Sequence, residues 1–162
     1  MVYVDNLLVL SHQAVQIMKG LEEFYRLKDG YAMPSRYLGA EVKQWHFQDD
    51  TNKMKWALSS SQYIKEAIKN IEAHLLIQDC KLFTSHQPLP SNYLPEIDIT
   101  PFLDDREKNF YQSQISILRW MVELGQLDIY VHVALLSPYL AQPQQGHLEA
   151  VYHIYSYLKA HG

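Results

Sequence analysis

A short hairpin with an acidic tip is the feature of this 162-residue sequence that most constrains its fold. Apolar residues flank the tetrapeptide Tyr3-Val4-Asp5-Asn6, with Met1-Val2 before it and the run 7–10 after it. β-Forming residues on either side of turn formers such as Asp and Asn are typical of two antiparallel strands joined by a tight turn. The sequence therefore predicts a β-hairpin that holds the Asp5 carboxylate at an exposed apex.

The tip of this hairpin carries one anionic and one neutral oxygen donor. Mg²⁺ prefers anionic oxygen ligands, and two such ions roughly 3.5 to 4 Å apart clamp the attacking and leaving oxygens of a phosphoryl transfer. Asp5 supplies one carboxylate, whereas Asn6 supplies only a neutral carbonyl oxygen. The tip therefore lacks one unit of negative charge relative to a pair of acids.

Composition predicts a soluble, cytoplasmic, globular chain. Apolar residues make up 48% of the sequence and charged residues 20%, which allows a core of useful size. We find no apolar run of the roughly 20 residues that a membrane span needs, and no basic opening segment of a secretory signal. The single cysteine, Cys80, cannot form an internal disulfide, which suits a reducing compartment.

The charge distribution limits where nucleic acid can bind. The formal net charge is −4. Residues 1–81 carry 10 basic and 10 acidic residues, whereas residues 82–162 carry 4 and 8. Because phosphate contacts need lysine and arginine, only the first half suits a nucleic-acid interface.

Periodic patterns in the first half predict an α+β fold of short hairpins and helices. Apolar residues at three- and four-residue spacing predict amphipathic helices between Ala14 and Tyr25 and between Ile64 and Leu75. Two strand-forming runs, 37–47 and 54–58, flank the polar turn 48–53 and predict a second hairpin.

A proline-rich stretch marks the expected domain boundary. Residues 87–101 contain four prolines with polar residues between them, a composition that opposes helices and central strands. We therefore expect residues 1–86 to form one unit, residues 87–101 to form a linker, and residues 102–162 to form a helical unit.

The C-terminal part is predicted to consist of three helices. Helical spacing of apolar residues runs from Tyr111 to Val122 and stops at Gly125, and it resumes from Leu148 to Leu158. The run 129–136 is so apolar that periodicity does not separate a buried helix from a strand, and we assign it to a helix.

Other polar clusters are interpreted as structural. Asp104-Asp105 suits a helix start and Asp49-Asp50 a loop, because adjacent acids usually point in different directions. His147-x-Glu149 lacks the Cys-rich second half of a zinc deaminase signature. We expect His147 to pack or to face solvent.

Four motifs in a fixed order resemble the carboxyl-terminal part of Ty1/copia-type retrotransposon reverse transcriptases. They are the first hairpin, similar to the Tyr-x-Asp-Asp hairpin of those enzymes, then Tyr37-Leu38-Gly39, the run 117–120, and the segment 146–150 that leads to Tyr157-Leu158-Lys159. The resemblance spans nearly the whole chain. It corresponds to the end of the palm, the primer grip, the thumb and the connection.

The resemblance implies an RNA-directed DNA polymerase site with Mg²⁺ as the cofactor of the intact relative. Because Asn6 is neutral, we expect weak or absent Mg²⁺ binding in this chain. By this resemblance, Asp5 and Asn6 stand at catalytic positions, and Asp5 and the Val4 backbone lie beside the metal and the incoming deoxynucleotide. The residues implied to contact the primer–template are Tyr3, Leu38, Gly39 and Trp45. A competing role for Trp45 is that of a hydrophobic anchor of the sheet.

The resemblance also implies a fragment of a longer polyprotein. We expect the other palm acid and the fingers to precede this segment and an RNase H domain to follow it, so the chain alone is expected to be inactive. An alternative is a non-catalytic relic or co-opted helical module that binds a protein or nucleic-acid partner. The amide of Asn6 and the acidic second half favour that alternative.

Overall fold

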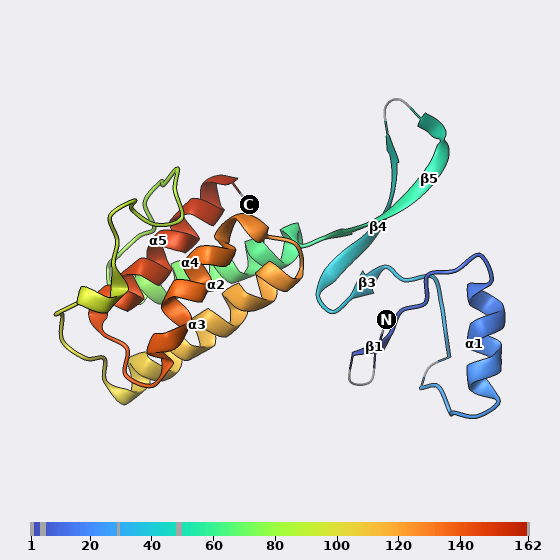
Figure 1. Ribbon diagram of the computed structural model, residues 1–162, viewed down its shortest axis with the longest axis horizontal. Helices are drawn as coiled ribbons and strands as arrows, with labels where there is room; N and C mark the ends of the chain where they lie inside the picture. The colour runs from blue at the N-terminus through green and yellow to red at the C-terminus, as the bar shows by residue number, and fades with distance from the viewer. Residues whose placement is uncertain (1, 4–5, 29, 48–49, 162) are drawn as a thin grey trace. The chain divides into compact units, whose positions relative to one another are not determined.

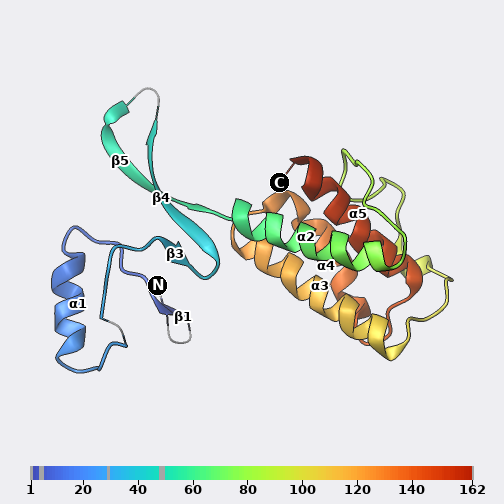
Figure 2. The same ribbon diagram turned by 180° about the vertical axis from the view of Figure 1, so that it is seen from behind.

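The computed structural model describes residues 2–3, 6–28, 30–47 and 50–161, and the chain divides into two compact units, Met1–Ser59 and Ser60–Gly162. The described strands lie in the first unit, together with one α-helix, and the second unit is helical (Figures 1 and 2). This arrangement confirms the predicted α+β class. Within the described ranges, every helix is too short or too polar to cross a membrane.

The first hairpin forms where the sequence predicts it. Strands β1 (Val2–Tyr3) and β2 (Asn6–Leu7) are antiparallel, with Val2 opposite Leu7 and Tyr3 opposite Asn6. This register leaves two residues between the strands. Those residues, Val4 and Asp5, lie outside the described part of the chain.

A three-stranded antiparallel sheet has the order β3 (Arg36–Tyr37), β4 (Ala40–Phe47), β5 (Asp50–Ser59). The predicted strand 37–47 is interrupted, because Leu38 and Gly39 have φ angles of 53° and 89° and form a two-residue turn. The predicted second hairpin is confirmed in the pairing of β4 with β5. Its loop is shorter than 48–53, since β5 begins at Asp50.

The first unit buries few apolar side chains in the part that is described. Helix α1 (Ala14–Glu22) is amphipathic, as predicted, but it buries none of its residues. The buried apolar residues of this unit are Leu8, Tyr37 and Ala40. A helix in water gains most of its stability from packing an apolar face, so the structure gives α1 little tertiary support.

The second unit has one hydrophobic core between helices. Helices α2 (Ser61–Ile77), α3 (Asp105–Glu123) and α5 (Gln145–His161) lie side by side (Figures 1 and 2). Helix α4 (Tyr130–Leu136) packs against α3, which confirms the predicted helix in the run 129–136. The largest fully buried side chains are Tyr111, Tyr155, Ile64, Ile71, Ile115, Leu118, Met121, Ile129, Leu136, Ile154, Leu158 and His147.

Three short 3₁₀ helices connect these elements: η1 (Pro95–Ile97), η2 (Leu127–Ile129) and η3 (Ser137–Leu140). The start of α3 is fixed by a capping box. The Asp104 carboxylate accepts the Glu107 backbone N–H at 2.8 Å, and the Glu107 carboxylate accepts the Asp104 N–H at 3.4 Å. The helix-start role predicted for Asp104 is therefore confirmed.

The proline-rich segment 87–101 lies inside the second unit, and the chain divides between Ser59 and Ser60 instead. The prolines exclude regular helix and strand, but Leu89 and Pro95 are buried against the helices. Side chains of the α5 start satisfy backbone carbonyls of this segment. Tertiary contacts thus fix the backbone of the segment 87–101, although its composition suggested a linker.

Candidate functional site

The N-terminal hairpin brings Tyr3 and Asn6 to directly opposite backbone positions. The predicted metal ligands, Asp5 and the Val4 backbone, lie outside the described residues. Their roles therefore stay predictions. The described pairing of Val2 with Leu7 and of Tyr3 with Asn6 agrees with the hairpin that the sequence predicts.

The described part of the chain offers no alternative metal centre. Among those residues, no three His, Cys, Asp or Glu side chains lie close enough together to hold an ion. Mg²⁺ binding thus remains an expectation that depends on Asp5 and on carboxylates from elsewhere.

The β4–β5 hairpin displays an aromatic residue between lysines. Trp45 lies opposite Lys55, and Lys43 lies opposite Ala57, so alternation along the strands puts these four side chains on one face. The Trp45 side chain is 59% exposed. Lys43 is exposed and forms an ion pair with Glu41 at 2.5 Å. This face can present a ring for base stacking between two cationic groups.

The other predicted contacts of this sheet have distinct environments. Leu38 and Gly39 form the tight β3–β4 turn, and both are half-buried. Tyr37 is buried and anchors the sheet, whereas Trp56 is exposed on the face opposite to Trp45. Sequence reasoning missed Lys43 and Lys55, because their alignment with Trp45 depends on the strand register.

A polar clasp joins the start of α5 to residues 95–100, and we call it the Gln144 clasp. The Gln144 side-chain amide donates to the Asp98 carbonyl at 3.1 Å and to the Thr100 carbonyl at 2.9 Å. The Gly146 N–H donates to the Thr100 hydroxyl at 2.9 Å. These bonds satisfy backbone groups of the proline-rich segment that have no partner in a regular element.

His147 is the buried centre of this clasp. Its Nδ1 accepts the Gln144 N–H at 3.0 Å, so the proton of the neutral ring is on Nε2, which donates to the Pro95 carbonyl at 3.0 Å. The Tyr139 ring lies 4.1 Å from the imidazole centroid. Both nitrogens are occupied by structural hydrogen bonds, which confirms the expectation that His147 packs.

Two buried tyrosines of the second unit, Tyr111 and Tyr155, donate structural hydrogen bonds. The Tyr111 hydroxyl donates to the Leu136 carbonyl at 2.7 Å, and the Tyr155 hydroxyl donates to Gln114 at 3.0 Å. Burial raises the pKa of both, and it raises the pKa of Tyr152 to about 12. These phenols stay protonated at neutral pH and do not serve as general bases.

We expect the second unit to lose stability as pH falls from about 7 towards about 5. Burial, followed by the Arg106 charge, lowers the pKa of His74, whose ring stacks on Phe110 with centroids 3.8 Å apart. The unfolded chain therefore binds a proton at its ordinary pKa of about 6.5 before the folded chain does, so protonation favours unfolding. Urea unfolding at the two pH values measures this loss, and His74→Gln should reduce it. An unchanged pH slope in His74→Gln would contradict the assignment.

The first unit contains an open pocket of about 680 Å³. Helix α1 lines it with Ala14, Val15 and Met18, and the segments 7–9, 27–28 and 30–37 supply the remainder. Its lining is mainly apolar, with Lys28 and Arg36 as the charged groups. The pocket suits an apolar group, and its described lining has no acid–base pair for chemistry.

Comparison with known proteins gives one informative relation. No protein-family model matches the chain. No solved structure matches it. A curated protein of Saccharomyces cerevisiae, named as a candidate transposon Ty5-1 protein (YCL074W), is 29% identical over 161 residues. The match covers 97% of this chain and 47% of that protein, so the chain spans about half the length of its relative. Over nearly its whole length, the chain is thus similar to a transposon protein, in agreement with the retrotransposon relation that its motifs indicate.

Proposed function

We propose that the chain is a segment of a Ty1/copia-like RNA-directed DNA polymerase that is inactive by itself. In this proposal the first hairpin carries the Mg²⁺ ligand Asp5, and the remaining acids come from protein outside this segment. The observation that carries the proposal is the similarity to a transposon protein over 97% of the chain. The strand pairing of Tyr3 with Asn6 supports it, because a two-residue connection suits the expected metal hairpin.

The β4–β5 hairpin supplies the primer–template contact in this proposal. Its Trp45 face combines an exposed ring with Lys43 and Lys55. Aromatic stacking on unpaired bases and lysine contacts with phosphates are the two main sources of sequence-independent nucleic-acid affinity. Since the first unit carries seven basic and seven acidic residues, the local arrangement matters more than the net charge.

Binding of the chain to a primed RNA template is expected to weaken about 5- to 100-fold in Trp45→Ala, the range for one lost stacking contact. Fluorescence anisotropy of a labelled primer measures this change. The matched control is Trp56→Ala, which removes the same ring from the opposite face of the hairpin. Affinity should also fall as salt is raised. Equal affinities for Trp45→Ala and the parent chain, or binding that is indifferent to salt, would refute the primer contact.

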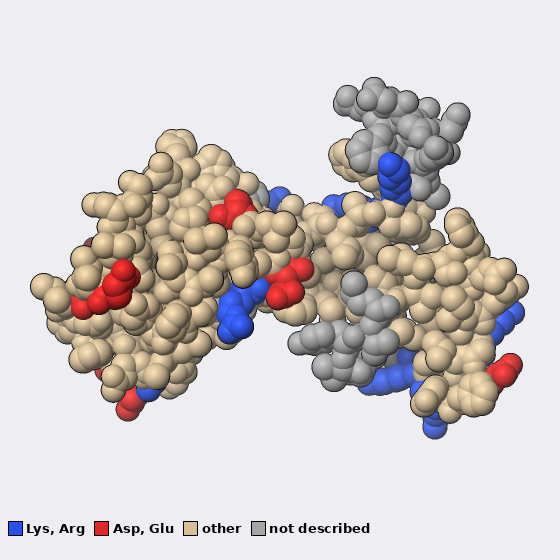
Figure 3. Space-filling view, in the orientation of Figure 1, with Lys and Arg blue, Asp and Glu red and all other residues tan. Residues whose placement is uncertain are grey.

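A second candidate function is a non-catalytic binding module. The Asn6 amide and the second unit, which carries eleven acidic against seven basic residues, favour it. Over that unit, Figure 3 shows acidic side chains at several separate places. Salt-sensitive template binding without primer extension, in a fusion that supplies the expected palm and fingers, would favour the module over the enzyme.

A further inference from the structure

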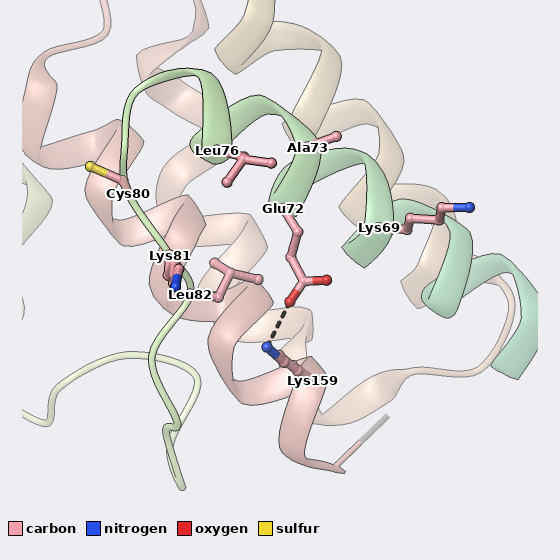
Figure 4. A pocket seen from close by; sticks show the side chains of 8 residues that line it. All are labelled: Lys69, Glu72, Ala73, Leu76, Cys80, Lys81, Leu82 and Lys159. Atoms are coloured by element: carbon pink, nitrogen blue, oxygen red, sulfur yellow. Dashed lines mark hydrogen bonds and ion pairs between the residues drawn. The ribbon is translucent and has the colours of Figure 1, made fainter.

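We propose that a lysine-rimmed pocket of the second unit binds the loop 94–102 of another copy of this chain. The pocket, which we call the lysine pocket, has a volume of about 410 Å³ and lies between α2, the segment 80–82 and the end of α5. Figure 4 shows the residues that line it: Lys69, Glu72, Ala73, Leu76, Cys80, Lys81, Leu82 and Lys159. None of them belongs to the loop 94–102, so each copy carries both the pocket and the loop.

The lysine pocket concentrates positive charge in an acidic unit. Three of the five lysines of residues 60–162 line it, namely Lys69, Lys81 and Lys159. Lys159 bonds to Glu72 at 2.6 Å, which joins α5 to α2 (Figure 4). Among the described residues, no carboxylate pairs with Lys69 or Lys81. The pocket therefore favours an occupant that brings negative charge.

The lining is also apolar between these charges. Ala73, Leu76 and Leu82 contribute hydrocarbon surface, and 67% of the Leu76 side chain is exposed. A purely ionic ligand would leave this surface in contact with water. An occupant that buries an apolar side chain and places a carboxylate at the rim matches both properties of the site.

The loop 94–102 has this combination on its outer side. Its exposed apolar residues are Leu94, Ile97, Ile99 and Phe102. Glu96 is an exposed acid next to Ile97, and 96% of the Ile99 side chain is exposed. Apolar side chains gathered at such exposure are typical of a surface that meets a partner.

The Gln144 clasp fixes the backbone conformation of this loop before a partner binds. The carbonyls on either side of Ile99, those of Asp98 and Thr100, both accept from the Gln144 amide. The Asp98 carboxylate also accepts the Thr100 N–H at 2.8 Å and its hydroxyl at 2.7 Å. Because the backbone is fixed before binding, the loop loses little conformational entropy when Ile99 or Ile97 enters a pocket.

The proposed contact joins two different surfaces, so it is heterologous. Such contacts give a closed ring or an open chain, depending on the rotation between copies. Its charged rim is exposed, which predicts weak association that decreases with salt.

Charge reversal tests the occupant of the pocket. We expect the weight-average mass in sedimentation equilibrium to rise above the 19.0 kDa monomer as the full chain is concentrated. Lys69→Glu with Lys81→Glu should weaken the association constant roughly tenfold, because repulsion of Glu96 replaces its attraction to these lysines. Glu96→Lys should also weaken it, and combining Glu96→Lys with Lys81→Glu in one chain should restore part of the loss. A weight-average mass that stays at the monomer value, or an association constant that these substitutions leave unchanged, would overturn the proposal.

Cysteine trapping gives an independent geometric test, because Cys80 lies in the pocket and is the single cysteine of the chain. In Ile97→Cys, mild oxidation should produce an intermolecular disulfide between Cys80 and the introduced thiol, identified by peptide mass spectrometry. The matched control is Leu127→Cys, since Leu127 is another exposed apolar residue of the same unit. Equal trapping in the two variants would contradict the contact. If the pocket variants change binding to a primed template but leave the mass unchanged, the occupant is nucleic acid and the proposal fails.

Discussion

Replacing Gly146 with alanine is expected to destabilise the second unit by about 2 to 3 kcal/mol, the cost of overpacking a buried contact and losing hydrogen bonds. A Cβ at this position would lie 2.9 Å from the Asp98 Cγ and closer still to its carboxylate oxygen. Asp98 cannot move away cheaply, because its carboxylate is almost fully buried and bonds to Thr100. Thermal unfolding followed by helical circular dichroism measures the effect.

Two further variants separate this steric effect from general loss of fold. Gly20→Ala is the matched control, since a Cβ at Gly20 in α1 meets no atom within 4 Å and alanine favours helix. In an Asp98→Ala background, Gly146→Ala should cost less than about 1 kcal/mol, because the clashing carboxylate is gone. An undiminished cost in that background would show that the contact with Asp98 is not the cause.

Changing Asn6 to aspartate is expected to raise primer extension by on the order of 100-fold in a fusion that supplies the palm and fingers expected to precede this segment. A second carboxylate would add one negative charge beside the two Mg²⁺ ions and stabilise the charge that develops on the transferred phosphate. Extension of a primed RNA template with deoxynucleotides measures the gain. The parent fusion carrying Asn6 gives the baseline.

The Asp5→Asn variant of the same fusion serves as the control, since it removes the remaining predicted ligand and should abolish extension. The gain from Asn6→Asp should also require Mg²⁺ and disappear when the metal is chelated. Equal rates for the parent fusion and its Asn6→Asp variant would refute the ligand role of this position. They would not affect the lysine pocket, whose tests rest on mass and on disulfide trapping.

Local patterns account for the elements that the sequence predicted correctly. The hairpin at Tyr3–Asn6 and the helices α2, α3 and α5 each follow from residues within one element, through turn formers or apolar periodicity. The helix in the run 129–136 needed a choice that periodicity did not decide. Its burial against α3 on one face agrees with a helix.

Two predictions for the first unit were wrong in detail, because the backbone conformation at these positions is not the one that the residue types favour. Leu38 adopts a left-handed φ of 53°, which leucine rarely does, so the pattern around it suggested a continuous strand. The polar residues 51–53 resembled a loop, but they lie within strand β5, beside a register shift in its pairing with β4. At Leu38, the pairing of β3 with β4 outweighed residue preference.

Long-range contacts explain what the sequence could not reveal in the second unit. The proline-rich segment takes a fixed path because Gln144 bonds to residues 44 and 46 positions away. The lysine pocket likewise combines Lys69, Lys81 and Lys159 from three separate parts of the chain. The candidate metal ligand Asp5 could be proposed from a single tetrapeptide, whereas these sites could not.

The Gln144 clasp links residues 98 and 100 to residue 144, so genetic recombination has to keep these segments in the same chain to preserve the contact. A gene rearrangement that cut between residues 100 and 144 would separate the amide donor from both of its acceptors. Each product would keep some helices but lose the hydrogen bonds that fix the proline-rich segment 87–101. We therefore expect neither product to be exchanged as an independent folding unit. The junction between Ser59 and Ser60 is, by contrast, a place where recombination could exchange the neighbouring segment and leave the helical half intact.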